Sequence, residues 1–196
     1  MATVIKHAGP KRRRWTRKEF YKLLDLGFFR RERLELIEGE IVVMPAQKNL
    51  HLLSIKLTED ALNAVFGTGY WVRVQGSLDL TPYSVVDPDL AVVQGNPRDF
   101  STESNPTTAL LIVEVSQTTL RFDRGRKASL YARAGIADYW VINLADRCLE
   151  IRRNPVPDNS QHYGYGYASL TTLAATDYAT PLAAPQARIL VADILP

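Results

Sequence analysis

The spacing of apolar residues along the chain predicts three helices. Apolar side chains recur every three or four positions over residues 49–66, a period typical of a helix with one buried face. Thr16 followed by Glu19 forms a capping-box pattern, which predicts the start of a second helix running from Arg17 to about Leu26. A third helix is predicted from Thr118 to Ala134, where Gly135 supplies a stop signal.

Other apolar runs are short or alternate with polar residues, as expected of strands. Leu110–Val115 is continuously apolar apart from Glu114, which predicts a central strand covered on both faces. Gly39 between two β-prone runs predicts a hairpin turn. Further strands are predicted at Tyr70–Leu80, Leu90–Val93, Tyr139–Leu144 and Cys148–Arg152, with a loop at Gln94–Thr108. Tyr163–Tyr167 is expected to form an edge strand or a loose aromatic segment. The fold class is therefore α/β or α+β, with a mixed β-sheet flanked by helices.

Length and composition fit one ordinary globular domain. The chain has 196 residues, of which 46% are hydrophobic and 23% charged. No apolar run approaches the roughly 18 residues that a membrane span needs, and the N-terminus has no apolar signal core. The single cysteine, Cys148, excludes an internal disulfide framework and a cysteine-rich zinc site. We therefore expect a cytoplasmic protein with no membrane partner.

Positive charge is concentrated at the N-terminus, because no acidic residue precedes Glu19. Residues 1–15 are predicted to form a basic, flexible arm, and residues 16–196 the folded domain. Arg12, Arg13 and Arg14 in this arm are candidates for contacting the phosphates of a nucleic acid through salt-sensitive attraction. A solvated tail without a binding role explains the same composition.

Two acidic residues carry the main chemical signal. Asp89 opens the apolar run Leu90–Val93, and Glu114 interrupts the run Leu110–Val115. A carboxylate on a buried strand is costly unless a cation or a hydrogen-bond donor meets it. Two such strands, each with an acid near one end, predict that the acids meet around a positive group, of which a divalent metal ion is the simplest candidate.

The helix predicted after Glu114 carries Asp123, Lys127 and Tyr131 at intervals of four residues, which places them close to one stripe. A lysine near a pair of metal-bound carboxylates can orient a water molecule or stabilise a developing oxyanion. The simpler interpretation, which the pattern alone favours, is an exposed helical ion pair between Asp123 and Lys127.

These residues, in this order, resemble a known family. The series is Glu35-x-x-x-Gly39, Pro45, His51, Pro88-Asp89, Glu114-Val115-Ser116, Asp123-x-x-x-Lys127-x-x-x-Tyr131, Gly135 and Tyr139-Trp140. It is similar to the Uma2 family of restriction-endonuclease-like proteins in the PD-(D/E)XK nuclease superfamily, over roughly Thr16 to Leu144. The individual motifs are weak, and their combination is specific.

The resemblance implies a role for each matching residue. Asp89 and Glu114 match the metal-binding acids, and the backbone carbonyl of Val115 would help to hold the ion. Glu35 matches an N-terminal glutamate that completes such sites. The superfamily's usual lysine position is occupied by Ser116, and Lys127 matches the helical lysine that replaces it in Uma2-like sequences. Magnesium, with manganese as a possible substitute, is the implied cofactor, and DNA the implied substrate.

Two further residues are possible substrate-binding groups. His51 would touch a phosphate or shape the site, or else cap or pack its helix. Gln75, like Ser77, could face the cleft, but alternation alone does not say which strand face is wet. The buried rings of Tyr131, Tyr139 and Trp140 are expected to be structural.

The leading hypothesis is a Mg²⁺-dependent endonuclease that hydrolyses DNA phosphodiester bonds, and by analogy a homodimer. One alternative is a non-catalytic nucleic-acid-binding protein that retains the nuclease fold. Another is a structural or regulatory subunit whose acidic cluster binds a metal ion for stability.

Overall fold

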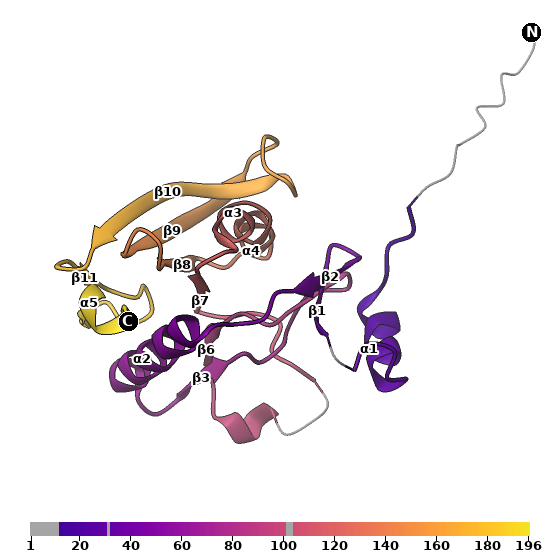
Figure 1. Ribbon diagram of the computed structural model, residues 1–196, viewed down its shortest axis with the longest axis horizontal. Coiled ribbons are helices and arrows are strands. Elements are labelled where there is room, and N and C mark those ends of the chain that lie inside the picture. Colours follow the sequence, from indigo (N-terminus) through magenta and orange to yellow (C-terminus); the bar gives the residue numbers. More distant parts are fainter. Residues whose placement is uncertain (1–11, 31, 101–103) are drawn as a thin grey trace, which may run out of the picture.

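The computed structural model describes residues 12–30, 32–100 and 104–196 (Figure 1). Most of the predicted basic arm therefore lies outside the described residues. Within the described ranges, no helix is long and apolar enough to cross a membrane.

The largest sheet has six strands in the order β10-β9-β8-β7-β6-β3. β7 and β8 pair in parallel, and the other neighbouring strands pair antiparallel. All six residues of β7 are buried, which confirms the predicted central strand. The strands are β3 (Tyr70–Val74), β6 (Leu90–Gln94), β7 (Leu111–Ser116), β8 (Asp138–Asn143), β9 (Cys148–Pro157) and β10 (Tyr165–Ala174).

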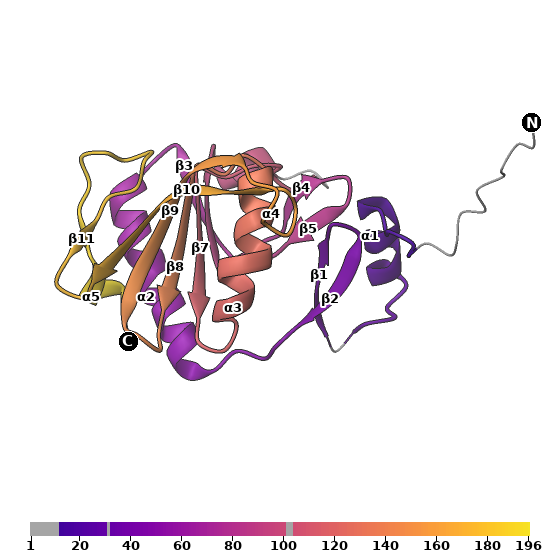
Figure 2. The same cartoon turned by 90° about the horizontal axis from the view of Figure 1, so that it is seen from above.

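Helices cover both faces of this sheet, as Figure 2 shows. The long helix α2 (Asn49–Phe66) and the short α5 (Val191–Ile194) pack on one face. The other face is covered by α3 (Leu120–Phe122), a π-helical turn (Asp123–Lys127) and α4 (Ala128–Arg133), which follow one another without a break. The mixed sheet with flanking helices confirms the predicted fold class.

A smaller sheet, ordered β2-β1-β5-β4, lies beside the larger one. Its strands are β1 (Arg33–Ile37), β2 (Glu40–Met44), β5 (Ser84–Val86) and β4 (Leu78–Thr81). The predicted hairpin joins β1 to β2, and Glu38 and Gly39 both have positive φ in its turn. Helix α1 (Arg17–Asp25) begins with the predicted capping box and buries Phe20 against this sheet.

The prediction of one strand over Tyr70–Leu80 is wrong. The chain turns at Gln75, whose φ is 52°, so β3 joins the large sheet and β4 joins the small one. Of the predicted Tyr163–Tyr167 segment, only Tyr165–Tyr167 lies in a strand. The edge strand β10 begins at Tyr165 and continues to Ala174, and its partner β9 continues to Pro157. The predicted loop at 94–108 contains a 3₁₀ turn (Pro97–Phe100).

A two-stranded sheet, β11 (Tyr178–Ala179) and β12 (Ile189–Leu190), precedes α5.

Candidate active site

Strand alternation brings Asp89 and Glu114 to the same place. Side chains alternate between the faces of a sheet, and Ile112 packs on the face covered by α4, so Glu114 also points there. Leu90 on β6 pairs with Val113 on β7. Continuing this antiparallel register by one residue places Asp89 beside Glu114. The predicted convergence of the two acids therefore follows from β-sheet geometry.

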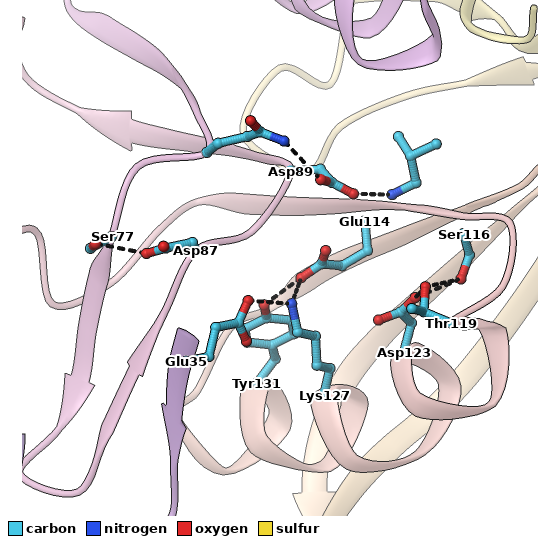
Figure 3. Close-up of polar contacts among 12 residues, drawn as sticks. Glu35, Ser77, Asp87, Asp89, Glu114, Ser116, Thr119, Asp123, Lys127 and Tyr131 are labelled. Atoms are coloured by element: carbon cyan, nitrogen blue, oxygen red, sulfur yellow. Dashed lines mark hydrogen bonds and ion pairs between the residues drawn. The ribbon is translucent and has the colours of Figure 1, made fainter. Parts of the chain in front are cut away.

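Glu114 is bonded to two side chains from the helix that covers it (Figure 3). Its Oε1 accepts a hydrogen bond from Lys127 Nζ at 2.8 Å and another from the Tyr131 hydroxyl at 2.6 Å. Lys127 Nζ also donates to Glu35 Oε1 at 3.0 Å. Lys127 and Glu35 are each only 1% exposed, so one buried ammonium joins a glutamate of the small sheet to one of the large sheet.

Asp123 and Lys127 do not form the exposed pair that the pattern favoured. Both are buried, and Lys127 bonds to the two glutamates instead. Asp123 Oδ2 accepts hydrogen bonds from the hydroxyls of Ser116 at 2.5 Å and Thr119 at 2.6 Å. Ser116, at the usual lysine position of the superfamily, thus supports an acid.

Asp89 is surrounded by hydrogen-bond donors. The Val115 amide donates to its Oδ2 at 2.9 Å, and Gln47 Nε2 donates to its Oδ1 at 3.0 Å. His51 Nε2 also lies 3.0 Å from Oδ1, and Gln75 Nε2 lies 3.5 Å from it. The structure therefore brings both predicted residues, His51 and Gln75, to the site, where they contact Asp89.

Burial and charge set the protonation of these acids. Burial raises the pKa of Glu114 to about 8; Lys127 opposes the shift, and Asp89, Asp123 and Glu35 add to it. Burial likewise raises the pKa of Glu35 against the attraction of Lys127. Burial also acts to raise the pKa of Asp89, but His51 and the Val115 amide outweigh it and the net pKa is lowered. Despite its own burial, Lys127 has a raised pKa because of Glu114 and Glu35, and it stays charged.

These groups line a cavity of about 50 Å³. Four of its acids are buried and Asp87 is half-buried, whereas Lys127 is the buried cation among its lining residues. The acids are Glu35, Asp87, Asp89, Glu114 and Asp123. The cavity thus holds five carboxyl groups and one buried ammonium, an imbalance that raised carboxyl pKa values or a bound cation can offset.

The donor set fits a magnesium ion. Within the described residues, no three His, Cys, Asp or Glu side chains are arranged to hold an ion by themselves. Mg²⁺ does not require such a cage, because it is commonly bound by one or two carboxylates and keeps several waters. Glu35 Oε2 is buried and has no hydrogen-bond partner among the described residues, so an acceptor for a donor such as metal-bound water is present.

The three candidate arginines of the N-terminal arm are not brought to this cavity. Instead, they pair with acids of their own chain. Arg12 lies 3.9 Å from Glu40, Arg13 pairs with Glu19, and Arg14 lies 2.9 Å from Glu38.

The site also contains Gln47 and Asp87, neither of which is among the residues singled out from the sequence. Gln47 lies before α2 and reaches Asp89 from outside any element, so no periodic pattern marks it. Asp87 lines the cavity and accepts a hydrogen bond from Ser77 at 2.7 Å. Asp87 could have been recognised because it lies two residues before Asp89, and side chains two residues apart along a strand point to the same face.

Fold and site together are those of a restriction-endonuclease-like protein with paired acids on adjacent strands. The profile of the Uma2 family, described as "Putative restriction endonuclease", matches residues 17–186, and the chain belongs to this family. A crystal structure described as "a putative nuclease belonging to DUF820", from Anabaena variabilis ATCC 29413, shares the fold. Its TM-score is 0.66 at 16% identity, over 91% of this chain and 96% of that chain. No curated protein matches. The family description supports a nuclease function.

Proposed function

We propose that this chain is a Mg²⁺-dependent endonuclease that hydrolyses phosphodiester bonds in DNA, with Mn²⁺ as a possible substitute ion. The observation that carries the proposal is the cavity in which five carboxyl groups surround one buried ammonium. Structural ion pairs are normally balanced in charge, because each unpaired buried carboxylate costs several kcal/mol. The excess is therefore suited to a site that takes up a cation.

Asp89, Glu114 and the backbone carbonyl of Val115 would hold the ion. When bound, Mg²⁺ supplies a water of lowered pKa and neutralises charge on the phosphate under attack. The donors around Asp89 fix the orientation of its carboxylate, since Gln47, His51 and the Val115 amide all bond to it.

In this proposal, Lys127 and Glu35 would orient the attacking water. An ammonium has three N–H donors, and Lys127 gives two of them to Glu35 and Glu114. Because Lys127 lines the cavity, its third N–H is available to a water or to a phosphate oxygen there. Glu35 Oε2, which makes no hydrogen bond within the described part of the chain, can accept one from the same water. Together they would align the water and stabilise charge that develops on the phosphate.

The test is nicking of supercoiled plasmid DNA with Mg²⁺, with Mn²⁺ or with EDTA. We expect cleavage with either ion and none in EDTA. Asp89→Asn and Lys127→Met should each lower the rate at least about 100-fold, because each removes a group that acts on the reacting atoms. Asp60→Asn is the matched control, because Asp60 is an exposed acid on α2, paired with Lys56; it should keep the wild-type rate.

Thermal unfolding of each variant shows whether it is folded. Cleavage that persists in EDTA, or a folded Asp89→Asn variant with full activity, would contradict the proposal. Salt-sensitive DNA binding without nicking under any divalent ion would instead support the non-catalytic nucleic-acid-binding alternative.

A further inference from the structure

The acidic cavity poses an electrostatic problem for its substrate, if the proposed function holds. A DNA strand carries a negative charge on every phosphate, and carboxylates repel it. Positive side chains at the cavity are therefore needed to bring phosphates near the acids. Three lining residues are cationic, and Lys127 is already bonded to Glu35 and Glu114.

Arg33 and Lys48 are the other two cations that line the cavity. Arg33 is the first residue of β1, and Lys48 immediately precedes α2. Both are exposed, and across the ranges 12–30, 32–100 and 104–196 neither side chain makes a hydrogen bond or lies within 4.0 Å of a carboxylate. Arg33 attracts the Asp87 carboxylate at longer range, but neither Arg33 nor Lys48 is held in an ion pair among the described residues, in contrast to Arg12, Arg13 and Arg14.

The cavity offers no platform for stacking a base. No Phe, Tyr or Trp is among its lining residues in the described chain. Proteins that bind single-stranded nucleic acid commonly stack its bases on aromatic rings in addition to contacting its phosphates. Each stacked base contributes about 1–3 kcal/mol. The side chains that line the cavity are therefore suited to binding the sugar–phosphate backbone of a nucleic acid.

We propose that Arg33 and Lys48 form a phosphate-binding site at the mouth of the cavity. They contact non-bridging oxygens of phosphates that flank the phosphodiester bond to be cleaved. The contacts are independent of base sequence, because phosphate oxygens are the same at every step. In this assignment the two residues bind substrate, and the buried acids and Lys127 act on the bond.

The test is the salt dependence of DNA binding, measured by fluorescence anisotropy in EDTA with two labelled duplexes of unrelated sequence. Each phosphate contact contributes about −0.9 to the slope of log affinity against log salt. Arg33→Gln and Lys48→Gln should therefore each make the slope shallower by about 0.9. Between 50 and 200 mM salt, the wild type should lose about 3.5-fold more affinity than either variant.

Lys56→Gln is the matched control, because Lys56 is an exposed lysine on α2 whose ammonium is paired with Glu59 and Asp60. It should leave the slope unchanged. With Mg²⁺, Arg33→Gln and Lys48→Gln should raise KM and leave kcat near the wild-type value. An unchanged slope in either variant, or an equal loss in Lys56→Gln, overturns the assignment.

The binding assay separates this inference from the proposed function. Wild-type protein that binds DNA through Arg33 and Lys48 but never cleaves it would refute the hydrolysis and leave the phosphate site standing. Wild-type cleavage with an unchanged slope in either variant would refute the phosphate site alone. Wild-type protein that neither binds nor cleaves DNA, with or without a divalent ion, would refute both.

Discussion

The two oxygens of the Glu114 carboxylate have different surroundings. Lys127 and Tyr131 both donate to Oε1. In Figure 3 the other oxygen lies on the side of Asp89. The Tyr131 hydroxyl therefore helps to hold one oxygen toward Lys127, so that the other would be available to the ion that we propose for Asp89 and Glu114. Groups that orient a ligand in this way commonly influence metal affinity as strongly as some ligands do.

Tyr131→Phe removes this hydroxyl and should weaken Mn²⁺ binding by about 10- to 100-fold in isothermal titration calorimetry, because the Glu114 carboxylate is less well oriented. Tyr139→Phe is the control. Tyr139 is also fully buried and lies edge-on against Tyr131, but its hydroxyl donates to the backbone oxygen of Asp123 at 3.0 Å. It should keep nearly the wild-type affinity. Equal affinities for the two variants would show that Tyr131 has only a packing role.

At the scale of elements, the helices and the central strand of the large sheet could be predicted because each carries its own periodic signal. The break at Gln75 could not, since polar–apolar alternation continues from β3 toward β4 while the chain moves from one sheet to the other. Which sheet a strand joins depends on distant segments. The convergence of Asp89 and Glu114 could be predicted from the sequence, because it requires only that their two strands be neighbours in the sheet.

The contacts of Lys127 were harder to predict. An α-helical spacing of four residues places Asp123 and Lys127 side by side. The structure forms a π-helical turn over these residues, and a strand on the far side of the site supplies Glu35 as a second partner. Neither the π-helical turn nor the contact with Glu35 can be recognised from the local spacing of residues. The predicted exposed ion pair between Asp123 and Lys127 is therefore wrong.

The β1–β2 hairpin positions Glu35 and depends on its turn glycine. Gly39 has a φ of 85°, and a Cβ there would lie 2.6 Å from Arg14 Cβ and 3.0 Å from Arg14 Cα. Gly39→Ala should therefore combine backbone strain with a steric clash. Gly69→Ala isolates the strain, because Gly69 has a φ of 88° and a Cβ there would meet nothing within 4 Å.

Urea unfolding should show a loss of about 1–2 kcal/mol for Gly69→Ala, the usual cost of a left-handed conformation for alanine. Gly39→Ala should lose about 1–3 kcal/mol more, as expected for overpacking. Equal losses in the two variants would mean that the chain near Arg14 moves aside and does not constrain the hairpin.

At the scale of the whole molecule, the acidic cluster joins the two sheets. Glu35 comes from the small sheet, and Glu114 and Lys127 come from the large sheet and its covering helix. The cluster is charge-imbalanced, so its protonation affects the free energy of unfolding of the entire domain. Glu114 gives the clearest case, because folding raises its pKa from an ordinary 4.5 to about 8.

The sign of the effect follows from this shift. The folded state holds the Glu114 proton more tightly than the unfolded state, so this group contributes its full stability below about pH 4.5. The contribution is lost as pH rises toward about 8, by at most about 1.4 kcal/mol per pH unit. Glu114→Gln keeps the shape and a carbonyl acceptor for Lys127 and Tyr131 but removes the titration.

The melting temperature of Glu114→Gln, relative to wild type in EDTA, should therefore increase steadily between pH 5 and pH 8. Titrations of groups remote from Glu114 cancel in this difference, and Asp89, whose pKa is lowered from an ordinary 3.8, stays ionised over this pH range. Asp60→Asn, which changes an exposed acid, should show a constant difference over the same range. A constant difference for Glu114→Gln as well would mean that Glu114 is ionised throughout, and that Lys127 alone balances the buried charge.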